Sequence, residues 1–228
     1  MTPERLAEVM EATWPPARAW RAGPFTLRDG AGGGKRVSAA SGDGAWTQAD
    51  LDGVMAEPLF LIRQGEAALD AALAVRGYKV VDPVVIYAAP VAGLTGEVPP
   101  LAAFPHWPPL EIARVIWDEG GITADRVAVM GRVLGPKAAV LARAGDRSAG
   151  VAFVALSGDA AMLHALEVRE AYRRQGIGAI LLRAAANWAA AEGAARLSLA
   201  VTKRNLAARA LYARAGMQVV GQYHYRMR

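Results

Sequence analysis

The segment that decides the fold lies in the second half of the chain, where an apolar run leads into a glycine-containing turn. It reads Met162-Leu163-His164-Ala165-Leu166-Glu167-Val168 and, after four further residues, Arg173-Arg174-Gln175-Gly176-Ile177-Gly178-Ala179. The apolar run predicts a strand, and the residues after the turn predict a long helix to about residue 191. A helix start exposes unpaired N–H groups, and glycine lets a ligand approach the backbone. The segment therefore predicts a phosphate or pyrophosphate site over residues 173–179.

Two other interpretations of this turn are open at this point. A tight turn with solvated arginines would have the same residues without any ligand. A dinucleotide-binding turn fits less well, because Leu181 stands where the third glycine of that motif belongs.

A second segment favours the anion site over these alternatives. It consists of a strand followed by an asparagine and a helix with a tyrosine and a glycine, at Leu199-Ala200-Val201, Asn205, Ala208, Leu211-Tyr212, Arg214 and Gly216-Met217. Together the two segments resemble the GCN5-related N-acetyltransferase (GNAT) family. The first carries that family's Arg/Gln-x-x-Gly-x-Gly/Ala signature, and the second its Asn and Leu-Tyr-x-x-x-Gly-Met/Phe pattern. The resemblance covers about residues 106–228.

The resemblance implies a fold and a cofactor. The fold would be α/β, a mixed sheet with helices on both faces, in which the strand before the turn splays from the next parallel strand. The pantetheine arm of acetyl-CoA would lie in the gap, and Asn205 would reach it. Tyr212 would reach the sulfur. The remaining cofactor-binding residues implied are Leu166 and Val168 on the strand, and Arg173, Arg174, Gln175, Gly176, Ile177, Gly178 and Ala179 around the pyrophosphate.

The helix spacing and the chemistry support the tyrosine. Asn205 and Tyr212 are seven residues apart, hence on one helix face and ~10 Å apart along the axis. Acetyl transfer to an amine leaves a thiolate that needs a proton, and a tyrosine of pKa ~10 holds one at neutral pH. The alternatives are a plain helix N-cap for Asn205 and a core aromatic role for Tyr212.

The attacking amine must also lose a proton, because an alkylammonium of pKa ~10.4 is almost wholly protonated at neutral pH. We favour His164 as the base: strand alternation puts it on the face of Leu166 and Val168. It also occupies the strand position of a histidine in arylalkylamine N-acetyltransferases, in a similar His-Ala-Leu-x-Val pattern. Glu167 is the rival base, although alternation points it to the opposite face. A satisfied structural histidine and an exposed or paired glutamate are the alternatives without catalysis.

Composition bounds the class of protein. The 228 residues are 54% hydrophobic and include no cysteine, which excludes wholesale disorder, disulfides and a cysteine nucleophile. We expect a cytoplasmic protein, since the first residues lack the order of a signal peptide and no apolar run reaches ~18 residues. Three histidines without cysteine suggest no metal site. Residues 101–228 carry 17 Lys/Arg against 9 Asp/Glu, which suits an anionic partner.

The chain divides at a proline-rich stretch. Five prolines in residues 96–110 deny a helix or a central strand, so we expect a linker between a domain over 1–95 and a catalytic domain over 111–228. An internal repeat appears at an offset of 139, where Ala68, Ala71, Ala74, Gly77, Val80 and Val81 match Ala207, Ala210, Ala213, Gly216, Val219 and Val220. The first half would then be a degenerate GNAT-like copy, because Leu73 stands opposite Tyr212 and Val37 opposite Gly176. The glycine-rich loop at 30–35 fails the phosphate-loop pattern, and we expect a flexible hairpin there.

These observations predict an acetyl-CoA-dependent N-acetyltransferase that acts on a primary amine by direct attack in a ternary complex. The acceptor would be a small molecule or a protein N-terminus, and Tyr223, His224, Tyr225 and Arg226 would line its pocket or else be solvated. The alternative is a non-catalytic acyl-CoA-binding or regulatory module. We expect no membrane partner. Nucleic acid is disfavoured as a partner, because the arginines are scattered and form no recognised motif.

Overall fold

The computed structural model describes residues 2–228. Met1, the first residue of the segment that was compared with a signal peptide, lies outside the described residues. The helices are α1 (Pro3–Thr13), α2 (Lys35–Ser38), α3 (Gln48–Asp52), α4 (Ala67–Val75), α5 (Glu111–Glu119), α6 (Ala124–Arg132), α7 (Ile177–Ala191) and α8 (Leu206–Arg214). Short 3₁₀ turns span Val91–Gly93 and Glu170–Tyr172. Within residues 2–228, no helix combines the length and the apolarity needed to cross a membrane.

Within residues 2–228, eleven strands form two sheets. A small sheet has the order β1 (Arg18–Ala22), β2 (Phe25–Asp29), β3 (Ser41–Gly42). The large sheet has the order β4 (Leu59–Arg63), β11 (Gln218–Met227), β5 (Lys79–Pro90), β10 (Arg196–Thr202), β9 (Ala160–Val168), β8 (Arg147–Ser157), β7 (Lys137–Ala144), β6 (Ala103–His106). It is mixed, because β9 and β10 are parallel and the other neighbours antiparallel. The expected α/β class with a mixed sheet is confirmed.

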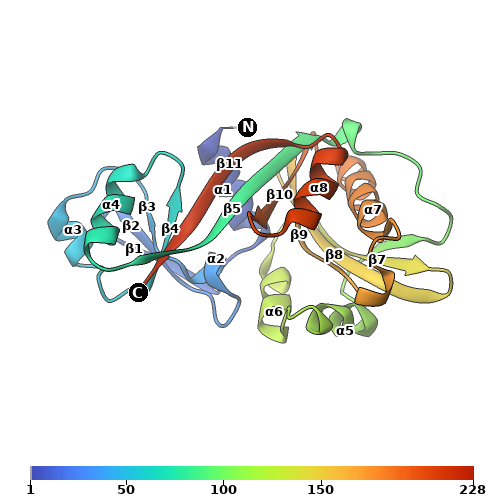
Figure 1. The fold of residues 1–228 in the computed structure, drawn as a ribbon, viewed down its shortest axis with the longest axis horizontal. Coiled ribbons are helices and arrows are strands. Elements are labelled where there is room, and N and C mark those ends of the chain that lie inside the picture. The colour runs from blue at the N-terminus through green and yellow to red at the C-terminus, as the bar shows by residue number, and fades with distance from the viewer. Residues whose placement is uncertain (1) are drawn as a thin grey trace.

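Helices cover both faces of the large sheet, as Figure 1 shows. Helix α7 packs on one face over a core that includes Val140, Val154 and Leu181. Helices α5 and α6 cover the other face over a core that includes Trp117, Met130 and Phe153. The site described below opens between these two layers, where the sheet meets the first half of the chain.

The internal repeat expected at an offset of 139 is present in the structure as an exchange of strands. Helices α4 and α8 have bounds that differ by 139 at both ends, and strands β5 and β11 begin 139 residues apart. Strand β5 pairs with β10 of the second half, while β11 pairs with β4 of the first.

The registers of the exchanged strands repeat with the same offset. The pair Ser198↔Ala88 corresponds to Met227↔Leu59, and Thr202↔Val84 corresponds to Tyr223↔Arg63. The central pair Tyr223↔Val84 maps onto itself, so a local pseudo-twofold axis passes between β5 and β11. The two halves of the chain therefore share one sheet, and in Figure 1 β5 and β11 run side by side between them.

Two local expectations differ from the structure, and one strand has no sequence signal. The sequence predicts a flexible hairpin around residues 30–35, but this loop leads into α2 at residues 35–38, after a turn with positive φ at Gly32 and Gly34. Strand β1 had no clear signal, because four of its five residues are exposed and its pattern is irregular. The proline-rich segment 96–110 contains β6, which lies at the sheet edge, where proline is tolerated because one side of the strand needs no hydrogen bonds.

Candidate active site

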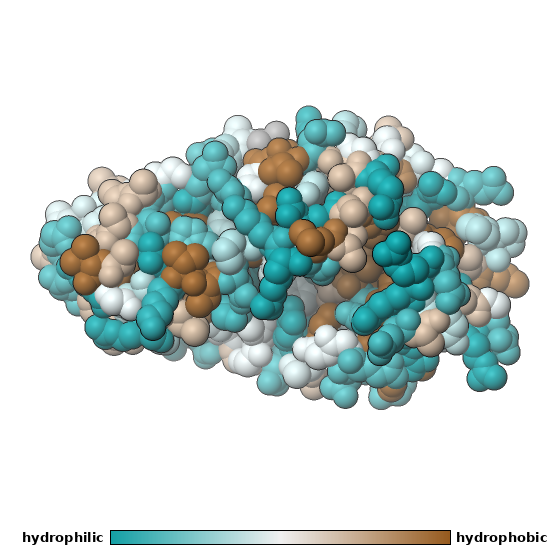
Figure 2. Space-filling model, viewed as in Figure 1, coloured by the Kyte–Doolittle hydropathy of each residue, from teal (hydrophilic) through white to brown (hydrophobic). Residues whose placement is uncertain are grey.

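A cleft of about 1330 Å³ opens beside the carboxyl ends of β9 and β10. Its lining comes from β9, β10, α7 and α8 of the second half and from the segments around α2, β5 and the start of the chain in the first half. In Figure 2 this face is hollowed near its middle, and hydrophilic side chains border the hollow. The volume exceeds the roughly 300–1,000 Å³ of a pocket for one small molecule, so the cleft has room for two ligands side by side.

The two parallel strands at the base of the cleft separate. Their pairing runs from Ala160↔Arg196 to Leu163↔Leu199 and then stops. Both strands continue, β9 to Val168 and β10 to Thr202, so the edge of β9 that faces β10 is unpaired over residues 164–168. Open backbone groups in such a gap can pair with the amides of an extended ligand.

A β-bulge in β9 changes which side chains share a face. Phe153 of β8 faces His164, while Val151, two residues away, faces Glu167, so β9 has one extra residue here. Ala165 in the bulge has a φ of 50°, and its carbonyl accepts a hydrogen bond of 2.8 Å from the Trp117 indole.

The bulge overturns the alternation argument for His164 and Glu167. The prediction that His164 shares a face with Leu166 and Val168 is wrong, because alternation does not continue through the extra residue. His164 and Glu167 instead lie on the same face, since their partners Phe153 and Val151 both pack in the core beneath α5 and α6. Leu166 and Val168 pack toward the α7 side.

His164 is buried and hydrogen-bonded at both ring nitrogens. Its Nε2 lies 2.9 Å from Thr13 Oγ1, and the Thr13 hydroxyl donates to the Val9 carbonyl, so Nε2–H is the donor. Its Nδ1 lies 3.1 Å from Arg36 Nη1 and must accept, because a guanidinium only donates. Burial and then the Arg36 charge lower the pKa of His164 well below its usual value. The ring thus offers no free lone pair to an amine, which favours the structural alternative.

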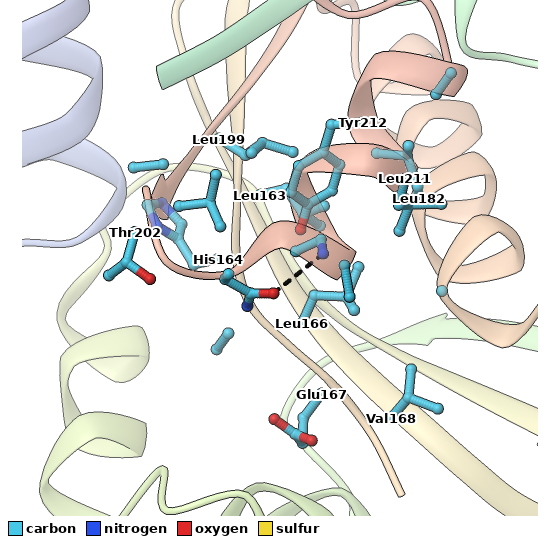
Figure 3. A pocket seen from close by; sticks show the side chains of 18 of the residues that line it. Leu163, His164, Leu166, Glu167, Val168, Leu182, Leu199, Thr202, Leu211 and Tyr212 are labelled. Carbon is cyan, nitrogen blue, oxygen red and sulfur yellow. Dashed lines mark hydrogen bonds between the residues drawn. The ribbon is translucent and has the colours of Figure 1, made fainter. Parts of the chain in front are cut away.

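Glu167 lines the cleft and is half-buried. Its Oε1 lies 3.3 Å from Arg173 Nη2, and the same guanidinium donates through Nε to the Val168 carbonyl at 3.0 Å. Arg173 is therefore tied to the end of β9, and its charge does not face the turn freely. Figure 3 shows the Glu167 carboxylate on the side of the cleft near α5 and α6, below His164.

The glycine turn presents backbone N–H groups to the cleft. Gly176 precedes α7 with a φ of 83°, and Arg174 also has a positive φ, of 64°. Within residues 2–228, no backbone carbonyl accepts from the N–H groups of Arg174, Gln175 or Gly176. A Cβ built on Gly176 would meet no atom within 4 Å, so the space above the turn is open. These features suit an anion at a helix start.

Other residues of the turn have structural partners. Ile177 is buried in the core beneath α7, and Gln175 Nε2 donates to the Ala171 carbonyl at 2.9 Å. The Ala179 N–H donates to the Gly176 carbonyl at 2.9 Å, so it belongs to the helix and is not free for a ligand. Gly178 has a packing reason for its missing side chain, since a Cβ there would lie 3.1 Å from Leu211 Cδ2 of α8.

Helix α8 brings the asparagine and the tyrosine to the other side of the gap. Asn205 caps the helix through Oδ1, which accepts from the Ala208 N–H at 3.1 Å, and its amide NH₂ remains exposed. Tyr212 is buried at 6% exposure, its ring is 5.9 Å from that of Tyr87, and burial raises its pKa to about 12. Figure 3 shows its ring projecting from α8 into the cleft toward β9.

The final strand, β11, places every second side chain in the cleft. Tyr223 and Tyr225 are buried and line the cleft. His224 and Arg226 face away, and both contact Asp70 Oδ1 of α4, at 2.7 and 2.6 Å. The expectation of a four-residue pocket wall or a solvated edge strand is thus wrong: β11 lies inside the sheet and only its tyrosines reach the cleft. Sequence reasoning also missed Trp14, Arg36 and Arg126, whose positions depend on contacts between distant segments.

Parallel strands that separate just before a glycine turn at a helix start, with a tyrosine on the following helix, define an acyl-CoA N-acyltransferase fold. Residues 111–217 match the model of the Acetyltransferase (GNAT) family, so this part of the chain is similar to that family. An uncharacterized N-acetyltransferase of Bacillus subtilis, YobR, is 39% identical over 61 residues, which are 27% of this chain and 25% of that protein. The match thus spans only a quarter of the relative's length.

Solved structures extend the likeness to almost the whole chain. A GCN5-related N-acetyltransferase from Kribbella flavida superposes with a TM-score of 0.73 at 18% identity, covering 98% of this chain and 94% of that one. A tandem GNAT protein from the clavulanic acid biosynthesis pathway superposes with a TM-score of 0.62 at 14% identity, covering 98% and 87%. At these identities the likeness concerns the fold, and it includes the first half of the chain.

Proposed function

We propose that the protein transfers an acetyl group from acetyl-CoA to a primary amine by direct attack in a ternary complex. The observation that carries the proposal is the juxtaposition of the open edge of β9 with the free N–H groups of the glycine turn and with Tyr212. The turn suits a pyrophosphate, the strand edge suits the amides of pantetheine, and the large cleft leaves space for an acceptor.

The residues divide the chemistry between them. Leu166 and Val168 pair with the arm of the cofactor, and Asn205 adds its free amide. The backbone N–H groups near Val168 stabilise the oxyanion that forms when the amine attacks, a contribution of roughly 3 kcal/mol. Tyr212 is protonated at neutral pH, with a pKa of about 12, and donates to the departing sulfur.

We assign the base to Glu167, directly or through water, in preference to His164. Both side chains lie on the same face of the sheet. His164 has both nitrogens engaged and a lowered pKa, whereas the carboxylate of Glu167 keeps acceptor capacity beyond its single contact with Arg173.

The first half serves as a wall of the acceptor site and has no cofactor site of its own. It contributes Trp14, Arg36 and Val84 to the cleft. In its own copy of the fold, the four-residue helix α2 begins where the repeat places the turn before the fifteen-residue α7, and the buried Leu73 replaces Tyr212. This copy therefore lacks the phenol, and Val37 stands where the repeat places Gly176.

The test is a panel of primary amines with acetyl-CoA, in which thiol release is followed by a thiol-reactive dye and the acetylated amine by mass spectrometry. Calorimetric titration with acetyl-CoA runs in parallel. Amine-dependent thiol release supports the proposal. Tight acetyl-CoA binding without turnover on any amine would instead indicate the acyl-CoA-binding module, and absence of binding would refute both.

A further inference from the structure

Two guanidinium groups lie together on the wall of the cleft that belongs to α2 and α6. Arg36 of α2 and Arg126 of α6 both line the cleft that Tyr212 lines. The Nε atom of each is buried and has no hydrogen-bond partner among the described residues, 2–228. Burial and then the charge of Arg36 lower the pKa of Arg126, as expected where two like charges line one cleft.

No carboxylate in the part of the chain that the structure describes neutralises this pair. Within residues 2–228, neither guanidinium has an acidic oxygen within 4.0 Å. The two acidic residues of the cleft are engaged elsewhere. Asp82 pairs with Lys35 at 2.9 Å and Arg204 at 3.6 Å, and Glu167 pairs with Arg173. Two half-buried positive charges without a counter-charge are costly to keep, unless a ligand supplies the negative charge.

The hydrogen-bonding neighbours of Arg36 are uncharged. Its Nη1 donates to His164, and the buried tyrosines Tyr223 and Tyr225 stand on the strand next to it. These groups orient the guanidinium without neutralising it. Because His164 is the first residue of β9 beyond the pairing with β10, Arg36 lies beside the gap where the acetyl group would be transferred.

The glycine-rich loop explains how the two arginines come together. A Cβ on Gly33 would collide with Val129 of α6, and one on Gly32 would collide with Asp125. A Cβ on Gly34, where φ is 97°, would lie 3.9 Å from Arg126 Nε. The loop can therefore rest on α6 only because it has no side chains, and this contact carries Arg36 to the side of Arg126.

We propose that Arg36 and Arg126 together bind an oxyanion group of the acceptor, so that the acetylated amine also bears a carboxylate or a phosphate. A guanidinium presents two parallel N–H groups that match either oxyanion. The partial burial of both guanidinium groups strengthens the contact. The inference rests on the proposed function and narrows the acceptor from any primary amine to an anionic one.

The test titrates one neutral and two anionic N-acetylated probes into the protein by calorimetry at low ionic strength. N-acetyl-L-alanine carries a carboxylate, N-acetyl-L-alaninamide is neutral, and N-acetyl-O-phosphoethanolamine carries a phosphate. We expect the carboxylate or the phosphate probe to bind at least 10-fold more tightly than the amide, and the tighter of the two identifies the group. We expect Arg36→Gln and Arg126→Gln each to weaken binding of the anionic probe about 10- to 100-fold, without weakening binding of the amide.

Two matched variants make the test specific. Arg36→Lys keeps the positive charge but loses the parallel N–H groups of the guanidinium. It should therefore weaken binding of the anionic probe less than Arg36→Gln does. Arg147→Gln removes an exposed arginine at the start of β8 and should leave the binding of all three probes unchanged. Equal binding of the amide and both anions, or an unchanged preference in both glutamine variants while folding is intact by circular dichroism, would overturn the inference.

The outcome separates this inference from the proposed function. If acetyl-CoA binds and neutral amines are acetylated as well as anionic ones, the inference fails and the proposed function stands. If acetyl-CoA does not bind but the anionic probes do so through Arg36 and Arg126, the proposed function fails and the anion site stands.

Discussion

Replacing Tyr212 by phenylalanine tests the proposed chemistry most directly, because it removes one hydroxyl and keeps the buried ring. The ring is 6% exposed and packs against Tyr87, so Tyr212→Phe should leave the free energy of unfolding within about 0.5 kcal/mol. General acid catalysis contributes typically 10²–10⁴-fold to a rate. The change should therefore appear in kcat and not in stability.

The structure places the expected loss at the low end of that range. The pKa of Tyr212 is about 12, whereas that of an ordinary thiol is about 8.5, so complete proton transfer to the thiolate is uphill by about 5 kcal/mol. The phenol then acts chiefly as a hydrogen-bond donor to the developing charge. We expect kcat to fall about 100-fold, which corresponds to ~2.7 kcal/mol, with the acetyl-CoA Kd unchanged.

The assay is single-turnover acetylation by rapid quench, with acetyl-CoA affinity from calorimetry. Tyr87→Phe is the matched control, because it makes the same chemical change in a ring 5.9 Å away that does not line the cleft. The alkaline limb of the pH–rate profile below about pH 11 should be the same in the wild type and in Tyr212→Phe, since a phenol with a pKa of about 12 does not ionise there. A kcat that falls less than threefold, or equally in both variants, would refute the role of Tyr212.

Three further predictions concern the turn, the histidine and the cap. Gly176→Val forces a β-branched residue to a φ of 83° and should cost about 1–3 kcal/mol of stability and weaken acetyl-CoA binding at least 10-fold by calorimetry; unchanged affinity would exclude the turn as the pyrophosphate site. His164 has a lowered pKa in the folded state, so its stabilising contribution is complete above about pH 6.5 and declines as the pH falls below it, by at most ~1.4 kcal/mol per pH unit. Urea unfolding of wild type and His164→Gln between pH 7.5 and 5 should show this decline in the wild type only, and parallel curves would contradict it. Asn205→Ser keeps the helix cap but loses the amide NH₂, so it should retain stability and weaken acetyl-CoA binding. Asn205→Ala should weaken acetyl-CoA binding and also lose about 1 kcal/mol of stability. Equal acetyl-CoA affinity in the wild type and both variants would show that Asn205 acts only as a helix cap.

Much of the fold could be predicted from local pattern. The glycine turn of residues 173–179 and the helix after it were recognisable because dipole, glycine and strand-to-helix signals coincide within a few residues. Helix α8 and its cap at Asn205 were predicted for the same reason. The repeat was detectable because helix and strand periodicity keep the small and apolar residues of both copies in the same places.

The roles of His164 and Glu167 could not be predicted in the same way. Alternation assigns faces correctly only along a regular strand, and the single extra residue at Ala165 inverts every assignment on one side of it. Nothing in the sequence near Ala165 signals a bulge, because alanine is not a residue that favours a positive φ. The Trp117 indole that holds the bulge comes from α5, 48 residues earlier.

The sequence by itself determined the class of the second half, the position of the turn, and the two copies of the strand–helix–strand unit. Only the tertiary structure decided that β5 pairs with β10 of the second half and β11 with β4 of the first. The hydrogen bonds between strands join backbone groups that are alike in both copies, so they do not specify which strand is the partner. The tertiary structure also decided that Arg36 and Arg126 line the same cleft, because these residues are 90 positions apart in the chain and only the packing of distant segments brings them to one wall. The cleft therefore has a wall that neither half of the sequence describes alone.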